Sequence, residues 1–241
     1  MAMNPPPPIT LLAMHGWGGD HRAWSPWAQA AAGRGWPLNT GERGYGRQAP
    51  LPAAWRIQGR RALLVHSLGL HLVPPQVLAG AEAVVLLASF GRFVPEGPQG
   101  RRGRQALAGM ARRLRQGSVD ALLRDFLAEA AAPDPVELLP AGPREDGVPP
   151  AGLERLLEDL DRLERCNGLP EGFPNEARVL VVEAGADRIV APECRRQLVE
   201  ALPAATHWPL EGAGHSLLRA DLLGPVLDWL QQALGGTGPH G

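Results

Sequence analysis

The sequence predicts an α/β fold, in which a mainly parallel sheet of about six strands is flanked by helices. Apolar runs without polar alternation recur along the chain, as expected of parallel strands that are buried on both faces. The first runs are each followed by a helical or crossover segment, which indicates a parallel sheet. Between residues 90 and 176 these runs stop, and amphipathic helical patterns replace them.

Five strands are predicted directly from the apolar runs. They cover residues 9–14, 61–66, 83–88, 178–183 and 206–210. The helices predicted beside them cover residues 20–32, 192–202 and 217–234, with Asp20 as the cap of the first. The helix that follows residue 67 should end early, because Pro74 and Pro75 remove a hydrogen-bond donor and clash with the preceding turn.

Three amphipathic helices are predicted in the segment 90–176. The first two present apolar faces around residues 107–114 and 122–127, with Ser118 as a cap between them. The third covers residues 153–163, and the proline-rich residues 131–151 are predicted to form a loop. The chain is thus divided into a core, residues 1–89 and 177–241, and a helical insertion, residues 90–176.

Composition and charge favour a small soluble protein. The net charge of -1 gives no reason to expect a nucleic acid or a membrane surface as partner. The first ten residues have neither the basic start nor the apolar stretch of a signal peptide, so we expect a cytoplasmic monomer. Cys166 and Cys194 are too few for a disulfide framework, and each should pack as a small apolar residue.

A sharp turn follows the predicted strand 61–66. The run ALLVHSLG, residues 62–69, ends at Ser67, and Gly69 follows two residues later. In a strand-to-helix turn of this kind the serine backbone is strained, and the positions two before and two after it must be small. Gly69 meets this requirement and Val65 does not. Ser67 is therefore a candidate nucleophile in a degenerate form of the motif.

Three other stretches accompany this turn. LLAMHGWGGD, residues 11–20, leads from a strand into a glycine-rich turn, while GADRIV contains Asp187 and GAGHS contains His215. Serine, acid and histidine in this order, preceded by a His-Gly turn, resemble the α/β-hydrolase family. The resemblance implies a further short strand and glycine turn at residues 38–45 and a lid role for the insertion. The family usually has an antiparallel hairpin ahead of the first strand, and this sequence departs from the family there, which is why about six strands are expected.

The resemblance also implies a catalytic triad. The hydroxyl of Ser67 needs a base, and His215 would take its proton and later protonate the leaving group. Asp187 would accept the other ring N–H of His215. The alternative is an ordinary turn serine, a loop carboxylate and a surface histidine.

Attack by Ser67 creates an oxyanion, which needs two fixed donors. The resemblance implies the backbone N–H groups of Leu68 and Trp17, with Gly16 allowing the substrate to approach the backbone. We expect His15 to organise this turn rather than to transfer protons. Trp17 is also a candidate wall of the substrate pocket, with a structural role as the alternative.

No metal and no cofactor are predicted. His66 and His71 are not spaced as ligands on one helix face, and the two cysteines lack partners at zinc spacing. The glycine turns are neither a Walker loop nor a dinucleotide-binding fingerprint.

The predicted insertion has a polarised charge. Residues 92–124 hold eight Arg and two acidic residues, a local charge of +6, whereas residues 125–176 carry a local charge of -9. Solvated helix faces and internal ion pairs are the usual explanation. The functional alternative is that Arg112, Arg113 and Arg115 receive an acidic partner or substrate, since guanidinium groups suit phosphate and carboxylate.

A closer resemblance rests on HGWGGDHRAW, the Ser67 turn, LLASFGRFVPEG with the basic helix after it, and GADRIVAP. These segments are similar to the pimeloyl-[acyl-carrier protein] methyl ester esterases of biotin synthesis, whose basic lid meets an acidic carrier protein. The resemblance, which is poor over residues 131–172, implies a serine esterase acting on that carrier-bound ester. The alternatives are another small-ester, thioester or carbon–carbon bond hydrolase of the same fold, or a non-catalytic binding protein.

Overall fold

The fold is organised around a fully parallel sheet with the strand order β2-β1-β3-β4-β5-β6. The computed structural model describes residues 7–235. Most of the first ten residues, on which the expectation of no signal peptide depends, therefore lie outside the described residues. Within them the sheet has six strands, as predicted. They are β1 (Ile9–Met14), β2 (Leu38–Thr40), β3 (Arg60–His66), β4 (Ala83–Leu87), β5 (Arg178–Ala184) and β6 (Thr206–Leu210).

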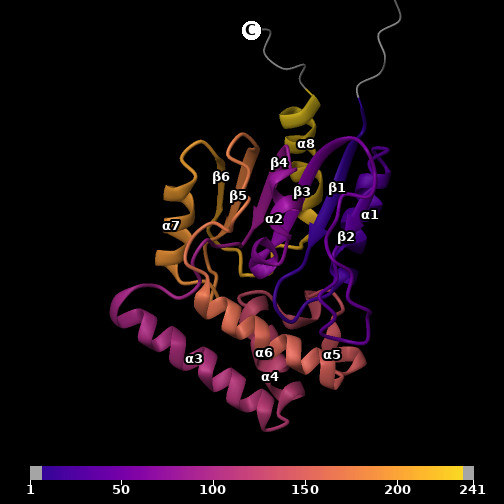
Figure 1. Ribbon diagram of the computed structural model, residues 1–241. Coiled ribbons are helices and arrows are strands. Elements are labelled where there is room, and N and C mark those ends of the chain that lie inside the picture. The colour runs from indigo at the N-terminus through magenta and orange to yellow at the C-terminus, as the bar shows by residue number, and fades with distance from the viewer. Residues whose placement is uncertain (1–6, 236–241) are drawn as a thin grey trace, which may run out of the picture.

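Both faces of the sheet are buried, which explains why its strands lack polar alternation. Leu11 and Leu64 point into a core that is covered by α1 (Ser25–Ala32) and α8 (Ala220–Gly235). Their neighbours Leu12 and Leu63 point into a second core on the opposite face. This core is covered by η2 (Ser67–His71), α2 (Pro75–Ala79) and α7 (Pro192–Ala201), as Figure 1 shows.

Several predicted elements differ in detail from the structure. The helix after Ser67 is a short 3-10 helix that stops before Pro74, as the proline pair requires. Ser118 occupies the N-cap of α4, but its side chain makes no capping bond, and its backbone N–H donates to the carbonyl of Arg113 at 3.0 Å. The last helix begins at Ala220 rather than at residue 217.

The helices between β4 and β5 lie together at the carboxyl end of the sheet (Figure 1). They are α3 (Gly97–Arg115), α4 (Val119–Ala131), η3 (Val136–Leu138), α5 (Pro143–Asp146) and α6 (Pro150–Arg165). Trp17, Leu68 and Phe90 of the sheet side share one buried cluster with Leu107 and Leu160 of these helices. Among the described residues, no helix is long and apolar enough to cross a membrane.

A buried carboxylate ties α6 to the loop after β2. Asp159 is fully buried, and its side chain accepts hydrogen bonds from the hydroxyl of Tyr45 at 2.6 Å and from Nε of Arg43 at 2.6 Å. Nε of Arg162 donates a third bond at 3.2 Å. A buried charge with this many donors is stable only while its partners are in place.

We expect Asp159→Ala to lower the free energy of unfolding by about 3 kcal/mol, because it removes the acceptor of the Tyr45 hydroxyl and of Nε of Arg43. The measurement is urea denaturation at neutral pH. Asp161→Ala is the matched control, since Asp161 is exposed on the same helix and should change stability by less than about 0.5 kcal/mol. Equal effects of the two substitutions would show that the buried bonds contribute nothing.

Candidate active site

Ser67 lies in a sharp turn directly after β3. Its backbone φ is +55°, a left-handed conformation that is uncommon for a residue with a side chain. A Cβ at Gly69 would lie 2.4 Å from the carbonyl oxygen of Met14, so only glycine fits there. Val65, the departure from the usual motif, is fully buried in the core that also contains Leu70. The degenerate motif therefore still forms the strained turn.

The structure brings the three predicted side chains together in one line. Ser67, Asp187 and His215 follow β3, β5 and β6, whose carboxyl ends meet at one edge of the parallel sheet. Nε2 of His215 lies 2.9 Å from Oγ of Ser67, and Nδ1 lies 2.8 Å from Oδ2 of Asp187. All three residues are buried. This geometry allows a proton to pass from the serine to the imidazole.

The carboxylate of Asp187 is fixed from both sides. Its Oδ1 accepts the backbone N–H groups of Ile189 at 2.7 Å and Val190 at 2.9 Å. Burial would raise the pKa of Asp187, but the charge and hydrogen bond of His215 and the two N–H groups outweigh it and lower the pKa. Asp187 therefore stays ionised at neutral pH, with Oδ2 directed at the imidazole.

His66 belongs to the site, although at the variable position of the turn it was expected only to pack behind the site. Its Nε2 donates to the backbone carbonyl of His215 at 3.0 Å, and the two rings lie 5.1 Å apart. Burial, followed by the neighbouring charge of His215, lowers the pKa of His66 to about 3. His66 is therefore a neutral donor that holds the backbone of His215. In the sequence, only its position directly before Ser67 indicates that His66 lies close to the nucleophile.

The glycine-rich turn after β1 packs against the nucleophile. A Cβ at Gly16 would lie 2.8 Å from Cβ of Ser67, so the two backbones approach closely only because residue 16 is glycine. His15 is buried, with Nδ1 bonded to the carbonyl of Gly16 at 2.9 Å and Nε2 accepting the N–H of Arg43 at 3.1 Å. His15 thus organises the turn, as expected.

The two expected oxyanion donors are the backbone N–H groups of Trp17 and Leu68, on either side of Ser67. The N–H of Trp17 donates to no other backbone group among the described residues. Leu68 is the second residue of η2, and the first N–H groups of a helix have no partner within that helix. The indole of Trp17 is fixed, because Nε1 donates to the carbonyl of Leu156 at 3.0 Å and the ring packs edge-on against Phe126 at 4.9 Å.

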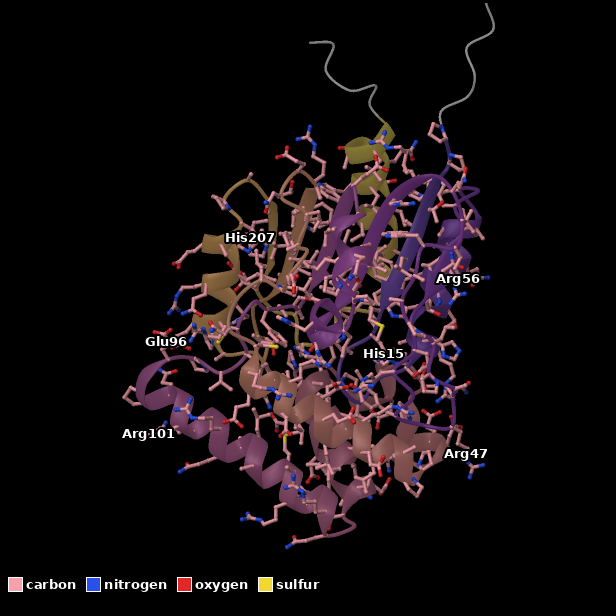
Figure 2. All side chains as sticks on the ribbon, in the orientation of Figure 1. His15, Arg47, Arg56, Glu96, Arg101 and His207 are labelled. Carbon is pink, nitrogen blue, oxygen red and sulfur yellow. The ribbon has the colours of Figure 1, made fainter. Side chains whose placement is uncertain are left out.

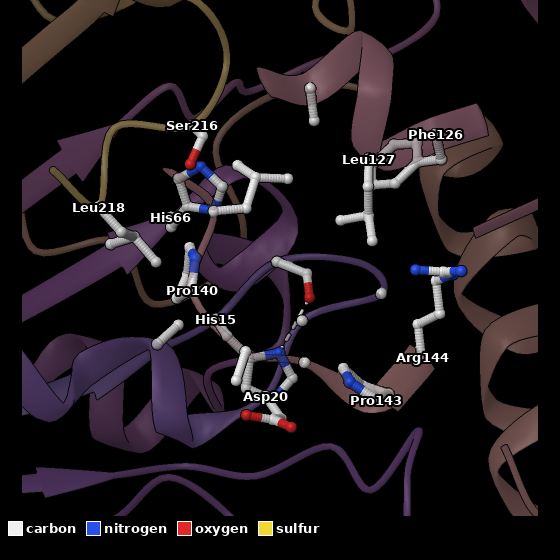
Figure 3. Close-up of a pocket in the computed structure, with 18 of the residues that line it drawn as sticks. His15, Asp20, His66, Phe126, Leu127, Pro140, Pro143, Arg144, Ser216 and Leu218 are labelled. Carbon is white, nitrogen blue, oxygen red and sulfur yellow. Dashed lines mark hydrogen bonds between the residues drawn. The ribbon is translucent and has the colours of Figure 1, made fainter. Parts of the chain in front are cut away.

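Two cavities meet at Ser67, and Trp17 and Phe126 line both of them. The first, which we call the His215 cavity, has a volume of about 290 Å³. Figure 3 shows His66, Ser216 and Leu218 on one side of it and Phe126, Leu127 and Arg144 across from them. The second, the α3 cavity, has a volume of about 440 Å³ and is lined by Phe93, Leu107, Met110, Ile189, Arg102 and Arg188.

The arginines singled out in the sequence do not meet Ser67. Arg112, Arg113 and Arg115 lie on the last turns of α3 and line neither cavity. Arg113 forms an ion pair with Asp125 at 2.6 Å. The arginines that line the two cavities are Arg102 and Arg188 in the α3 cavity and Arg144 in the His215 cavity. None of them was assigned a role of its own from the sequence, although Arg188 directly follows Asp187.

One group of described residues has the geometry to hold a metal ion. Ligand atoms of Asp20, His21 and Glu42 lie within 4.8 Å of one another. Glu42 already accepts the backbone N–H groups of His21 at 2.9 Å and Gly44 at 2.7 Å, and Asp20 is paired with Arg22. These bonds give the cluster a structural role in the turn beside His15.

No protein-family model matches the sequence, and no curated protein matches it. Solved structures do match the fold. An esterase from Exiguobacterium antarcticum has a TM-score of 0.72 and 14% identity, covering 94% of this chain and 93% of that one. An enol-lactonase from Burkholderia xenovorans has a TM-score of 0.69 and 18% identity, covering 96% and 94%. A bromoperoxidase from Bacillus anthracis has a TM-score of 0.67 and 17% identity, covering 95% and 93%. The chain has the α/β-hydrolase fold.

Proposed function

We propose that the protein is a serine hydrolase that cleaves carboxylic esters. The observation that carries this proposal is the line of hydrogen bonds from Ser67 through His215 to Asp187, which begins at a strained turn and opens onto two cavities. The esterase and the enol-lactonase among the similar structures support the same class of reaction. A binding protein would have no need of a strained serine held against a base.

In the proposed mechanism, Oγ of Ser67 attacks the ester carbonyl while Nε2 of His215 takes the hydroxyl proton. The negative charge that forms on the carbonyl oxygen is stabilised by the backbone N–H groups of Trp17 and Leu68. His215 then returns the proton to the leaving alcohol, and water attacks the acyl-enzyme in the same way. Asp187 stabilises the imidazolium and holds its orientation.

The proposed substrate is the methyl ester of a pimeloyl chain on its carrier protein, with the helical insertion 90–176 as a lid. Arg101, Arg104, Arg112 and Arg115 recur at helical spacing along one side of α3, and none has an ion pair among the described residues. Figure 2 shows Arg101 on the outer side of this helix. Such a row of free guanidinium groups suits an acidic carrier protein.

Other substrates remain open alternatives on the same machinery. A different small ester, a thioester or a carbon–carbon bond next to a carbonyl would use the same nucleophile and base, because the fold does not determine the substrate. Restored growth of a biotin-requiring strain that lacks the esterase would favour the biotin pathway over these alternatives. A well-expressed chain that fails to restore growth would favour the alternatives.

We expect a fluorophosphonate to label the wild-type protein and not Ser67→Ala, because only the serine beside His215 is activated. Ester hydrolysis should fall by roughly 10⁴-fold or more in the same variant. Ser216→Ala is the control, since Ser216 is the other serine in the His215 cavity. Labelling that persists in Ser67→Ala and is lost in Ser216→Ala would assign the nucleophile elsewhere.

We expect His66→Phe to lower kcat by roughly ten- to a hundredfold with little change in KM. The backbone carbonyl of His215 loses its hydrogen-bond donor, so the imidazole of His215 moves away from its position beside Oγ of Ser67. His66→Gln keeps an N–H donor at a similar position and should retain most of the activity. The measurement is kcat for a soluble ester, with the thermal midpoint checked for both variants. If both substitutions had the same effect, the hydrogen bond would have no positioning role.

We expect the double variant Arg112→Glu/Arg115→Glu to raise KM for a carrier-bound ester by roughly fivefold or more, because like charges then face the acidic carrier. KM for a short soluble ester should stay the same. Arg56→Glu is the control, since Arg56 is exposed and lies far from α3 in Figure 2. Equal losses with both esters would show that these arginines act on the structure and not on the carrier.

A further inference from the structure

The two cavities at Ser67 divide the space around the reacting ester into separate compartments. Resting on the proposed ester hydrolysis, we infer that the His215 cavity holds the leaving alcohol, that the α3 cavity holds the acyl chain, and that the alcohol is not restricted to methanol. The enzyme would then cleave esters of alcohols with several carbon atoms.

The position of the base decides which cavity receives the alcohol. The leaving oxygen has to come within hydrogen-bond distance of Nε2 of His215, which returns the proton to it. His215 lines the His215 cavity and does not line the α3 cavity, whereas Ser67 lines both. The alcohol therefore leaves on the His215 side, and the acyl chain extends in the other direction.

A pair of aromatic rings separates the two compartments. Trp17 and Phe126 border both cavities and pack edge-on at 4.9 Å. Trp17 is only 5% exposed, and its indole is held by the carbonyl of Leu156. A substrate with its carbonyl carbon at Ser67 would therefore place its two parts on opposite sides of this pair of rings.

The volume of the His215 cavity sets the size of the alcohol. The cavity measures about 290 Å³, whereas a water molecule occupies about 30 Å³ in the liquid and methanol is one heavy atom larger. Leu127, Leu139 and Leu218 line it, so the surplus space is mainly apolar. The methyl group of a methyl ester would leave most of this apolar wall in contact with water, whereas an apolar alcohol of several carbon atoms would cover the wall.

The α3 cavity is the larger compartment and fits a chain. Its volume is about 440 Å³, and Phe93, Leu107 and Met110 give it an apolar wall along α3. Ala106 lies at its exposed side, one turn from Met110. Residues of α3 should therefore determine the preference for acyl length, and residues of the His215 cavity should determine the preference for alcohol size.

The test compares kcat/KM for two ester series. One series varies the alcohol (methyl, butyl and benzyl hexanoate), and the other varies the acid (methyl acetate, hexanoate and decanoate). Leu139→Trp fills the His215 cavity, with Leu138→Trp as its control because Leu138 is 72% exposed and outside that cavity. Ala106→Trp narrows the α3 cavity, with Ala108→Trp as its control because Ala108 is exposed on the same helix and lines neither cavity.

We expect the wild type to cleave butyl hexanoate at least as well as methyl hexanoate. Leu139→Trp should lower kcat/KM for the butyl and benzyl esters by at least roughly tenfold more than it lowers kcat/KM for the methyl ester. Ala106→Trp should instead lower kcat/KM for the longer acids and keep the order of the alcohols. Leu127→Trp fills the His215 cavity from another wall and replaces Leu139→Trp if that variant does not fold.

Opposite results would overturn the assignment. If Leu139→Trp changed the preference for acyl length, the two cavities would be assigned the wrong way round. If the wild type cleaved methyl esters and rejected butyl esters, the inference about the alcohol would be wrong while the proposed ester hydrolysis would stand. If the wild type cleaved none of these esters and Ser67 took up no fluorophosphonate, the proposed function itself would be wrong.

Discussion

The close approach of two backbone turns is the constraint on which the rest of the site depends. Gly16 after β1 and Gly69 after Ser67 both stand where a Cβ would collide, with Ser67 itself and with the carbonyl of Met14. The two turns meet because β1 and β3 are adjacent and parallel. Without this contact the left-handed turn at Ser67 would have nothing to hold it, and the hydroxyl would not face the imidazole.

The parallel sheet could be predicted because its strands carry a strong local signal. β1, β3, β4 and β5 are apolar on both faces, so a short run of sequence is enough to identify them. The order of Ser67, Asp187 and His215 was informative for a related reason. Each follows a strand, and strands of a parallel sheet end at the same edge, so the topology alone places the three residues close together.

The details of the helical segment could not be predicted, because they depend on contacts between distant residues. Which side of α3 faces the core decides that Arg102 reaches the α3 cavity while Arg112 and Arg115 do not. The bond from Tyr45 to Asp159 joins positions 114 residues apart, and the bond from His66 to His215 spans 149. No periodicity or spacing in the sequence carries information about such pairs.

Several hydrogen bonds join the helix α6 to the core, which limits how a substrate can enter. Asp159 binds Arg43 and Tyr45 of the loop after β2, and the carbonyl of Leu156 binds the indole of Trp17. Swinging this helix outward would expose a buried charge and release the tryptophan beside the nucleophile. The cover over Ser67 is thus anchored at α6, and opening the site at this helix would dismantle the wall beside the nucleophile.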